Sequence, residues 1–91
     1  MAGSYGRMAI LPLESSVGRE DDRAMTIEIL LFDGFDDLDV FGPFEVLRTA
    51  GMQVRLVTVE DAATVTSAGG ARIVPDGVLG DPELVLVPGG P

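Results

Sequence analysis

Four aspartates gather in one short segment of this 91-residue chain, Phe32 to Leu47 (FDGFDDLDVFGPFEVL). They follow an apolar run that predicts a strand, and the carboxyl ends of strands are where open α/β sheets bind ligands. For Asp33, Asp36 and Asp37, loop solubility and capping of the next helix are the ordinary explanation. Asp39 differs because its sequence neighbours are apolar and core-directed. It is a candidate functional residue, with a purely structural role as the competing interpretation.

A second candidate is the segment Val87-Pro88-Gly89-Gly90, which follows the last apolar run of the chain. Gly89 and Gly90 carry no side chain, so a ligand can approach their backbone, and their amides could face a developing negative charge. An ordinary turn at the end of a strand is the alternative interpretation.

The residue types that are missing limit the chemistry of the chain. It has no histidine and no cysteine, so the commonest general base near neutral pH and the most nucleophilic side chain are both absent. The aspartates lack the spacing of an EF-hand, and no glycine-rich phosphate loop occurs. We therefore predict no metal site and no cofactor, and catalysis by this chain alone would rest on carboxylates, hydroxyls or backbone amides.

Charge excludes further classes of function. Fifteen acidic residues against six basic ones give a net charge of −9, which repels nucleic acid phosphates and anionic membranes. No apolar run approaches the ~20 residues that span a bilayer, and the first 24 residues do not have the pattern of a secretory signal. We expect a cytoplasmic protein that binds neither nucleic acid nor membrane directly.

An α/β pattern must position the candidate residues. Residues 26–32 (TIEILLF) and 53–59 (QVRLVTV) are typical of buried parallel strands. Apolar residues at helical spacing lie between them, and Gly51 stands where a glycine ends a helix. Either the helix begins near Asp37 and contains Pro43, or Pro43 is its first residue and Gly42 its cap.

The rest of the chain divides into shorter elements. Residues 65–68 and 71–74 flank a Gly-Gly pair and predict a hairpin, residues 76–82 a loop, and residues 83–87 a last buried strand. Residues 1–24 are mostly polar and predict a flexible amino-terminal extension to the regular body, 25–91. One helix for at least three strands leaves much of a parallel sheet uncovered, so we predict that a missing segment or a second chain completes the fold.

Three of these segments together resemble a known family. The strand that leads into FDGFDDLDVFGPFEVL, then VTSAGGARIVPD, then LVLVPGGP are similar, in this order, to the amino-terminal half of the ThiJ/PfpI superfamily. The resemblance covers residues 25–91 and implies an α/β, flavodoxin-like parallel sheet sandwich that is incomplete here. The string LDVFGP, residues 38–43, resembles the LDxxGP of isonitrile hydratases and of sensor domains fused to AraC-type regulators. PfpI-type proteases usually carry Glu where this chain has Asp39.

The resemblance implies roles for the candidate residues. Asp39 would be the acid–base partner of a cysteine nucleophile, the amides of Gly89 and Gly90 would contribute to an oxyanion pocket, and Gly42 and Pro43 would shape the substrate pocket. The cysteine would come from beyond Pro91, on a carboxy-terminal half supplied by a second chain or a missing segment.

The same resemblance implies an activity for the complete protein, which would be a homodimer. It would add water to an isonitrile and give an N-substituted formamide, whereas this chain alone would be inactive. One alternative is a small-molecule-sensing domain of an AraC-type transcription regulator. Another is a hydrolase, lyase or redox-stress protein of the same superfamily.

Overall fold

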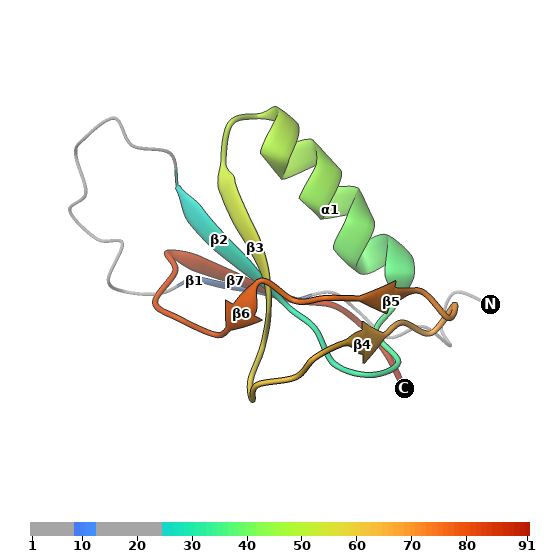
Figure 1. The fold of residues 1–91 in the computed structure, drawn as a ribbon. Coiled ribbons are helices and arrows are strands. Elements are labelled where there is room, and N and C mark those ends of the chain that lie inside the picture. The colour runs from blue at the N-terminus through green and yellow to red at the C-terminus, as the bar shows by residue number, and fades with distance from the viewer. Residues whose placement is uncertain (1–8, 13–24) are drawn as a thin grey trace.

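A five-stranded sheet and one helix make up most of the computed structural model, which describes residues 9–12 and 25–91 (Figure 1). The strand order in this sheet is β1-β7-β2-β3-β6, and β4 and β5 form a separate pair. The elements are β1 (Ala9–Pro12), β2 (Thr26–Leu30), α1 (Asp37–Thr49), β3 (Gln53–Thr58), β4 (Val65–Thr66), β5 (Arg72–Ile73), β6 (Gly77–Val78) and β7 (Leu84–Val87). No helix in these described ranges combines the length and the hydropathy needed to cross a membrane.

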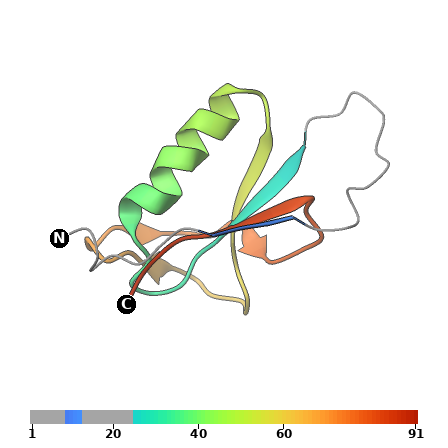
Figure 2. The same ribbon diagram turned by 180° about the vertical axis from the view of Figure 1, so that it is seen from behind.

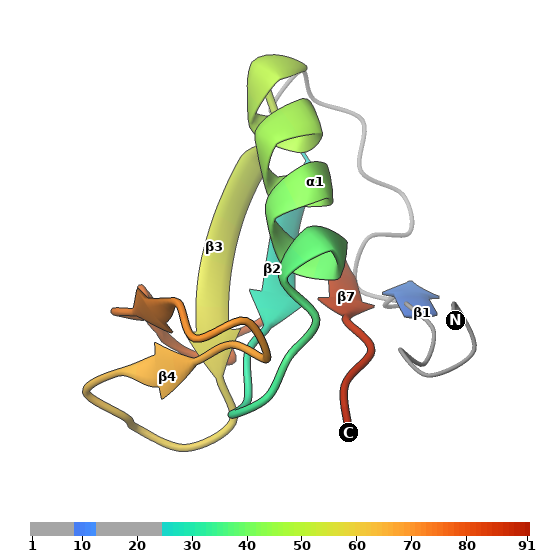
Figure 3. The same cartoon turned by 90° about the vertical axis from the view of Figure 1, so that its right-hand side faces the viewer.

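The centre of the sheet is parallel, as the apolar runs predicted. β2 pairs in parallel with β3 on one side and with β7 on the other. Alternate residues of these strands point toward α1, which lies along one face of the sheet (Figure 3). There Ile29 and Val40 are fully buried, and burial of such a side chain stabilises a fold by about 1.5–3 kcal/mol. The α/β fold class is therefore confirmed.

Helix α1 begins directly after an aspartate cap. Asp36 accepts hydrogen bonds from the amides of Leu38 and Asp39, at 3.0 and 3.2 Å. The helix ends at Thr49, and Gly51 follows with φ +93°, a conformation that glycine adopts without strain. Pro43 lies inside the helix. Of the two predicted alternatives, the helix that begins near Asp37 is the one observed, and the one with Gly42 as cap is wrong.

The buried carboxylate of Glu28 links the segment before β7 to Arg55, whose side chain is exposed, on the face of the sheet opposite α1. Glu28 is 5% exposed, and its Oε2 lies 2.7 Å from Nη1 of Arg55 on the neighbouring strand. Its other oxygen accepts the amide of Gly80 at 2.8 Å. Since both oxygens have donors, the buried charge is compensated.

Part of the predicted loop 76–82 is a strand instead. Residues 77 and 78 form β6, which pairs in parallel with the end of β3. The sequence did not predict this strand because it begins with a glycine, and glycine is rare in strands. At Gly77 a Cβ would lie 2.6 Å from Nη2 of Arg55, so a side chain there would displace the flexible end of the Arg55 side chain.

The prediction of a flexible extension over residues 1–24 is wrong for residues 9–12. These residues form β1, which pairs antiparallel with β7 in the register Ala9↔Val87 to Pro12↔Leu84 (Figure 2). The exposed edge of a buried strand presents unpaired N–H and C=O groups. A four-residue segment that ends in proline has a weak local preference for a strand. Hydrogen bonding to the edge of β7 makes it a strand in the structure. The other residues of the predicted extension lie outside the described part of the chain.

Candidate active site

The candidate site lies where the direction of the sheet changes. From β2 the chain passes to β3 on one side, and it later returns to β7 on the other side of β2. In open α/β sheets ligands bind at such a switch point, outside the carboxyl ends of the strands. The segments that leave β2 and β7 at this point carry Asp39 and Gly89, so the topology brings the two predicted motifs to one place.

A direct hydrogen bond joins the two motifs. The amide of Gly89 donates to Oδ2 of Asp39 at 2.9 Å, and the amide of Asp36 donates to the carbonyl of Gly89 at 2.8 Å. Gly89 is buried and Asp39 is half-buried. Figure 3 shows the segment that follows β7 running past the first turn of α1. The peptide of Gly89 is thus held on both sides by residues at the start of this helix.

Close packing fixes the rest of the glycine segment. A Cβ on Gly90 would lie 2.7 Å from Cε1 of Phe32 and 3.1 Å from the carbonyl oxygen of Gly34. Gly34 has φ +90°, and a Cβ there would lie 2.9 Å from Cγ of Pro91. Any side chain at either position would separate the turn after β2 from the segment after β7.

The hydrogen bond of Gly89 changes one predicted role. Its amide was expected to face a negative charge that develops on the substrate, but it donates to Asp39 instead. It therefore positions the carboxylate. The amide of Gly90 forms no hydrogen bond with the described residues, so of the two predicted amides it is the one left to face a ligand.

Gly42 and Pro43 lie further along α1, both half-buried. A Cβ on Gly42 would meet only Cδ1 of Leu38, at the ordinary contact distance of 3.8 Å. Pro43 has no N–H, so it cannot donate to the carbonyl of Asp39, four residues earlier. Neither Gly42 nor Pro43 has a polar side-chain atom that could hydrogen-bond to the Asp39 carboxylate or to Gly89.

Two aspartates dock the hairpin formed by β4 and β5, here called the flap (residues 65–73). Asp37 accepts the hydroxyl of Ser67 at 2.6 Å and the amide of Gly69 at 2.9 Å, and Asp33 accepts the amide of Thr66 at 3.0 Å. The hydrogen bond from the Ser67 hydroxyl, and to a smaller extent that from the Gly69 amide, hold the pKa of Asp37 below its usual range. Sequence reasoning missed this role. The sequence feature that could have indicated it is the predicted tight hairpin, because the backbone amides of such a turn need hydrogen-bond acceptors.

The aspartates do not converge on a common point. Asp36 caps the helix, Asp39 accepts Gly89, and Asp33 and Asp37 face the flap. Within the described ranges, no group of three or more His, Cys, Asp and Glu side chains could hold a metal ion. The arrangement holds the carboxylate of Asp39 in a fixed orientation.

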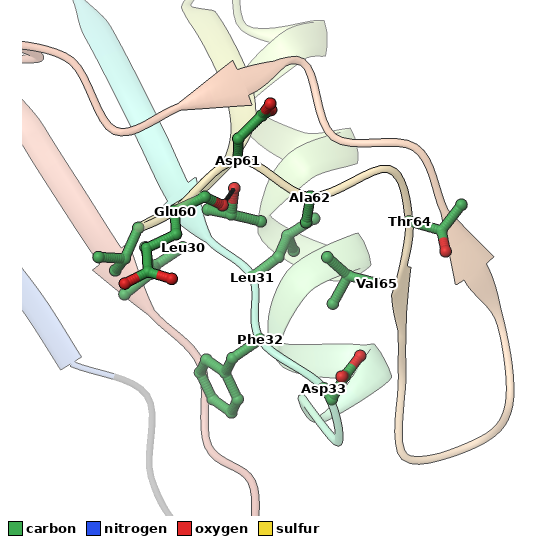
Figure 4. A pocket seen from close by; sticks show the side chains of 11 residues that line it. Leu30, Leu31, Phe32, Asp33, Glu60, Asp61, Ala62, Thr64 and Val65 are labelled. Carbon is green, nitrogen blue, oxygen red and sulfur yellow. Dashed lines mark hydrogen bonds between the residues drawn. The ribbon is translucent and has the colours of Figure 1, made fainter.

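A separate cavity of about 460 Å³ opens at the carboxyl ends of β2 and β3 (Figure 4). Leu31, Phe32, Asp33 and Val65 contribute to its lining, whereas Asp39 and Gly89 do not. Phe32 is common to the two places, because its ring also lies against Gly90. The cavity therefore adjoins the Asp39–Gly89 pair without containing it.

The parallel sheet with α1 on one face is a flavodoxin-like α/β fold. At its switch point the amide of Gly89 holds the carboxylate of Asp39, a candidate acid–base residue. Residues 25–91 match the DJ-1/PfpI family, and the chain belongs to this family. The predicted superfamily is thereby confirmed. None of the curated proteins compared with the chain matches it.

Solved structures share the fold at low sequence identity. A DJ-1 superfamily protein from Salmonella typhimurium, solved as a cysteine-to-alanine mutant, matches with a TM-score of 0.57 and 20% identity, over 59% of this chain and 29% of its own. The VC2308 protein gives 0.56 and 20%, over 60% and 28%. A candidate protease I from Bacteroides thetaiotaomicron gives 0.55 and 18%, over 60% and 32%. The chain thus spans about a third of the length of these structures.

Proposed function

We propose that the chain supplies the acid–base half of an isonitrile-hydratase-like enzyme, whose cysteine nucleophile comes from a separate segment. The observation that carries the proposal is the contact between Asp39 and Gly89, which places a fixed carboxylate at the switch point of the sheet. The LDVFGP string supports the choice of reaction, because it resembles isonitrile hydratases and has Asp where PfpI-type proteases usually have Glu.

The two oxygens of Asp39 take different roles in this proposal. Oδ2 accepts the Gly89 amide and fixes the orientation of the side chain. Oδ1 accepts no hydrogen bond from the described residues, so it is the atom that exchanges protons with the cysteine and with water. A positioned general acid or base of this kind contributes about 10²–10⁴-fold to a rate.

The reaction balances with water as the sole co-reactant. The thiolate attacks the terminal carbon of the isonitrile, and that carbon takes the proton shared by the thiol and Asp39, which gives a thioimidate. Water then adds to the thioimidate carbon. Asp39 accepts a proton from this water and passes it to the nitrogen. The carbon–sulfur bond then breaks as the hydroxyl proton of the adduct returns to Asp39, and the thiolate and the N-substituted formamide are released.

The test uses the complete protein, in which this chain is joined by the segment that carries the cysteine. We expect Asp39→Asn to lower formamide production from an isonitrile by about 10²–10⁴-fold. The asparagine oxygen can still accept the Gly89 amide, so the fold should persist. Asp81→Asn is the matched control, since it removes an exposed carboxylate elsewhere.

Two outcomes would separate the parts of the proposal. Equal formamide production by wild type and Asp39→Asn would eliminate the acid–base role. If the complete wild-type protein makes no formamide although its cysteine is alkylated rapidly in a manner that depends on Asp39, the isonitrile substrate is wrong and the role of Asp39 stands.

A further inference from the structure

The cavity at the carboxyl ends of β2 and β3 has an apolar floor. Among the residues that line it, Leu31 and Val65 are buried, with exposed fractions of 2% and 4%. Phe32 and Ala62, both half-buried, extend this apolar surface (Figure 4). The volume of about 460 Å³ lies within the range of about 300–1,000 Å³ that is usual for small-molecule sites. The floor can therefore take up the apolar body of a small molecule.

The rim of this cavity is acidic. Asp33, Glu60 and Asp61 belong to the lining, and all three residues are exposed. Within the part of the chain that the structure describes, no arginine lines the cavity, and the sequence contains no lysine and no histidine. Figure 4 shows the carboxylates of Asp33 and Glu60 on opposite sides of the space beside Leu31 and Phe32, whereas Asp61 points away from it. A cation at the rim would therefore lie between two carboxylates.

Both carboxylates are held at the rim, and neither is neutralised by residues 9–12 or 25–91. Asp33 accepts the amide of Thr66 with Oδ1, at 3.0 Å, and its Oδ2 has no partner there. The carbonyl of Glu60 accepts the hydroxyl of the buried Thr58 at 2.6 Å, which fixes the backbone at the end of β3. The carboxylate of Glu60 forms no ion pair within the same ranges. Two like charges beside one space favour a cation between them.

We propose that this cavity binds a small organic ammonium ion, whose apolar body enters first and whose charge stays at the rim between Asp33 and Glu60. An apolar floor below an acidic rim selects such a molecule over the side chain of a lysine from another protein. A lysine side chain ends in its charge and would carry that charge onto the apolar floor, where desolvation is costly. Asp39 and Gly89 do not line the cavity, so the inference does not rest on the proposed function.

The first experiment compares three ligands on the full chain. Phenylbutylamine has the proposed chemistry, phenylbutanol has the same body without the charge, and N-acetyl-lysine methylamide has an ammonium group without the aromatic body. Titrations followed by the NMR shifts of the backbone amides give the dissociation constants at low salt. We expect phenylbutylamine to bind about tenfold more tightly than either of the others. Its advantage over phenylbutanol should shrink as salt is added, because salt screens charges at an exposed rim.

The second experiment removes the two rim charges. Asp33→Asn/Glu60→Gln retains a side-chain oxygen that can accept the amide of Thr66, so the flap should stay docked. We expect this variant to bind phenylbutylamine and phenylbutanol with affinities that agree to within about twofold, because exposed ion pairs account for the difference in wild type. Glu45→Gln/Asp81→Asn is the matched control. It removes as many charges from exposed positions outside the cavity and should keep the tenfold preference for the amine.

Equal binding of the amine and the alcohol by wild type would overturn the proposal, and so would an equal loss of preference in both double variants. Binding of the lysine derivative as tightly as phenylbutylamine would do the same, as would amide shifts confined to regions other than residues 30–33 and 58–65. If the rim variant does not fold, the ligand series, the salt dependence and the shift map of the unsubstituted chain still decide. None of these measurements depends on hydratase activity.

Discussion

The carboxylates at the start of α1 have separate partners although they lie within seven residues of one another. Asp36 binds amides of its own helix, Asp37 binds the flap, and Asp39 binds the segment after β7. Spacing in the sequence separated Asp39 from its neighbours as a candidate, and in the structure Asp39 is the one whose side chain contacts the segment after β7. Spacing could not show the partner of each side chain, because every partner except the cap comes from a distant part of the chain.

We expect Asp37→Asn to destabilise the chain at neutral pH and to have little effect in strong acid. The pKa of Asp37 is lowered in the folded state by Ser67 and Gly69. A group with a lowered pKa contributes stability above its unfolded pKa and loses that contribution as the pH falls through its folded value. The stability of wild type should therefore approach that of the variant below the usual pKa of aspartate.

Urea unfolding of both proteins over a series of acidic and neutral buffers measures this difference. Asp61→Asn, at an exposed position outside the flap contacts, is the control. A stability difference between Asp37→Asn and wild type that stays constant into strong acid would show that the flap contact does not depend on the charge of Asp37.

At the scale of elements, α1 combines good capping with two residues that disfavour helices. Pro43 removes one helical hydrogen bond, and Gly42 adds backbone freedom in the unfolded chain. The sequence predicted the end of the helix at Gly51 but left two alternatives for its start. The aspartate cap decides between them, because it already satisfies the first amides at Leu38 and Asp39.

We expect Gly42→Ala to stabilise the chain by about 0.5–1 kcal/mol, the usual difference between these residues inside a helix. The new methyl group has room, since Leu38 is its nearest neighbour at 3.8 Å. Chemical denaturation of the isolated chain measures the gain. If the complete protein loses activity while this variant is stabilised, Gly42 shapes the substrate pocket as the family resemblance implies. Unchanged activity would remove that role.

We expect the opposite effect from Gly90→Ala. Its Cβ would meet a ring atom of Phe32 at 2.7 Å and a backbone oxygen at 3.1 Å, so the segment after β7 must shift away from the turn after β2. Overpacking of this kind costs about 1–3 kcal/mol. Urea unfolding gives the loss, and the NMR shift of the Gly89 amide reports whether it still donates to Asp39. An unchanged shift and stability would contradict the close packing.

Short strands account for the parts of the fold that were not predicted. The long apolar runs and the Gly-Gly hairpin predicted β2, β3, β7 and the flap, because such patterns act locally. β1 and β6 have four and two residues, too few for any periodicity. Both form because they can hydrogen-bond to the edge of a neighbouring strand, β7 for β1 and β3 for β6. Their own residues do not indicate this, because the partner strands lie elsewhere in the sequence.

At the scale of the whole molecule, the site depends on the order of strands more than on any single motif. The Asp39 motif and the glycine motif are each weak signals, and the resemblance became specific only when both were taken in order. The strand order gives the physical reason, because β3 and β7 lie on opposite sides of β2. The segment after β7 is the one that contacts Asp39. The resemblance implied that both motifs contribute to one site, and the strand order of the sheet is what brings them together.

The hydrogen bond between Asp39 and Gly89 joins residues 50 positions apart, and this separation has a consequence for folding kinetics. The unit β2-α1-β3 is local and can form first, whereas the pairing of β7 with β2 must close a long loop at a larger entropic cost. The Asp39 contact forms only after that closure. We therefore expect a nascent or partly folded chain to have its helix and central strands before the contact between Asp39 and Gly89 forms, so that the proposed acid–base site assembles late in folding.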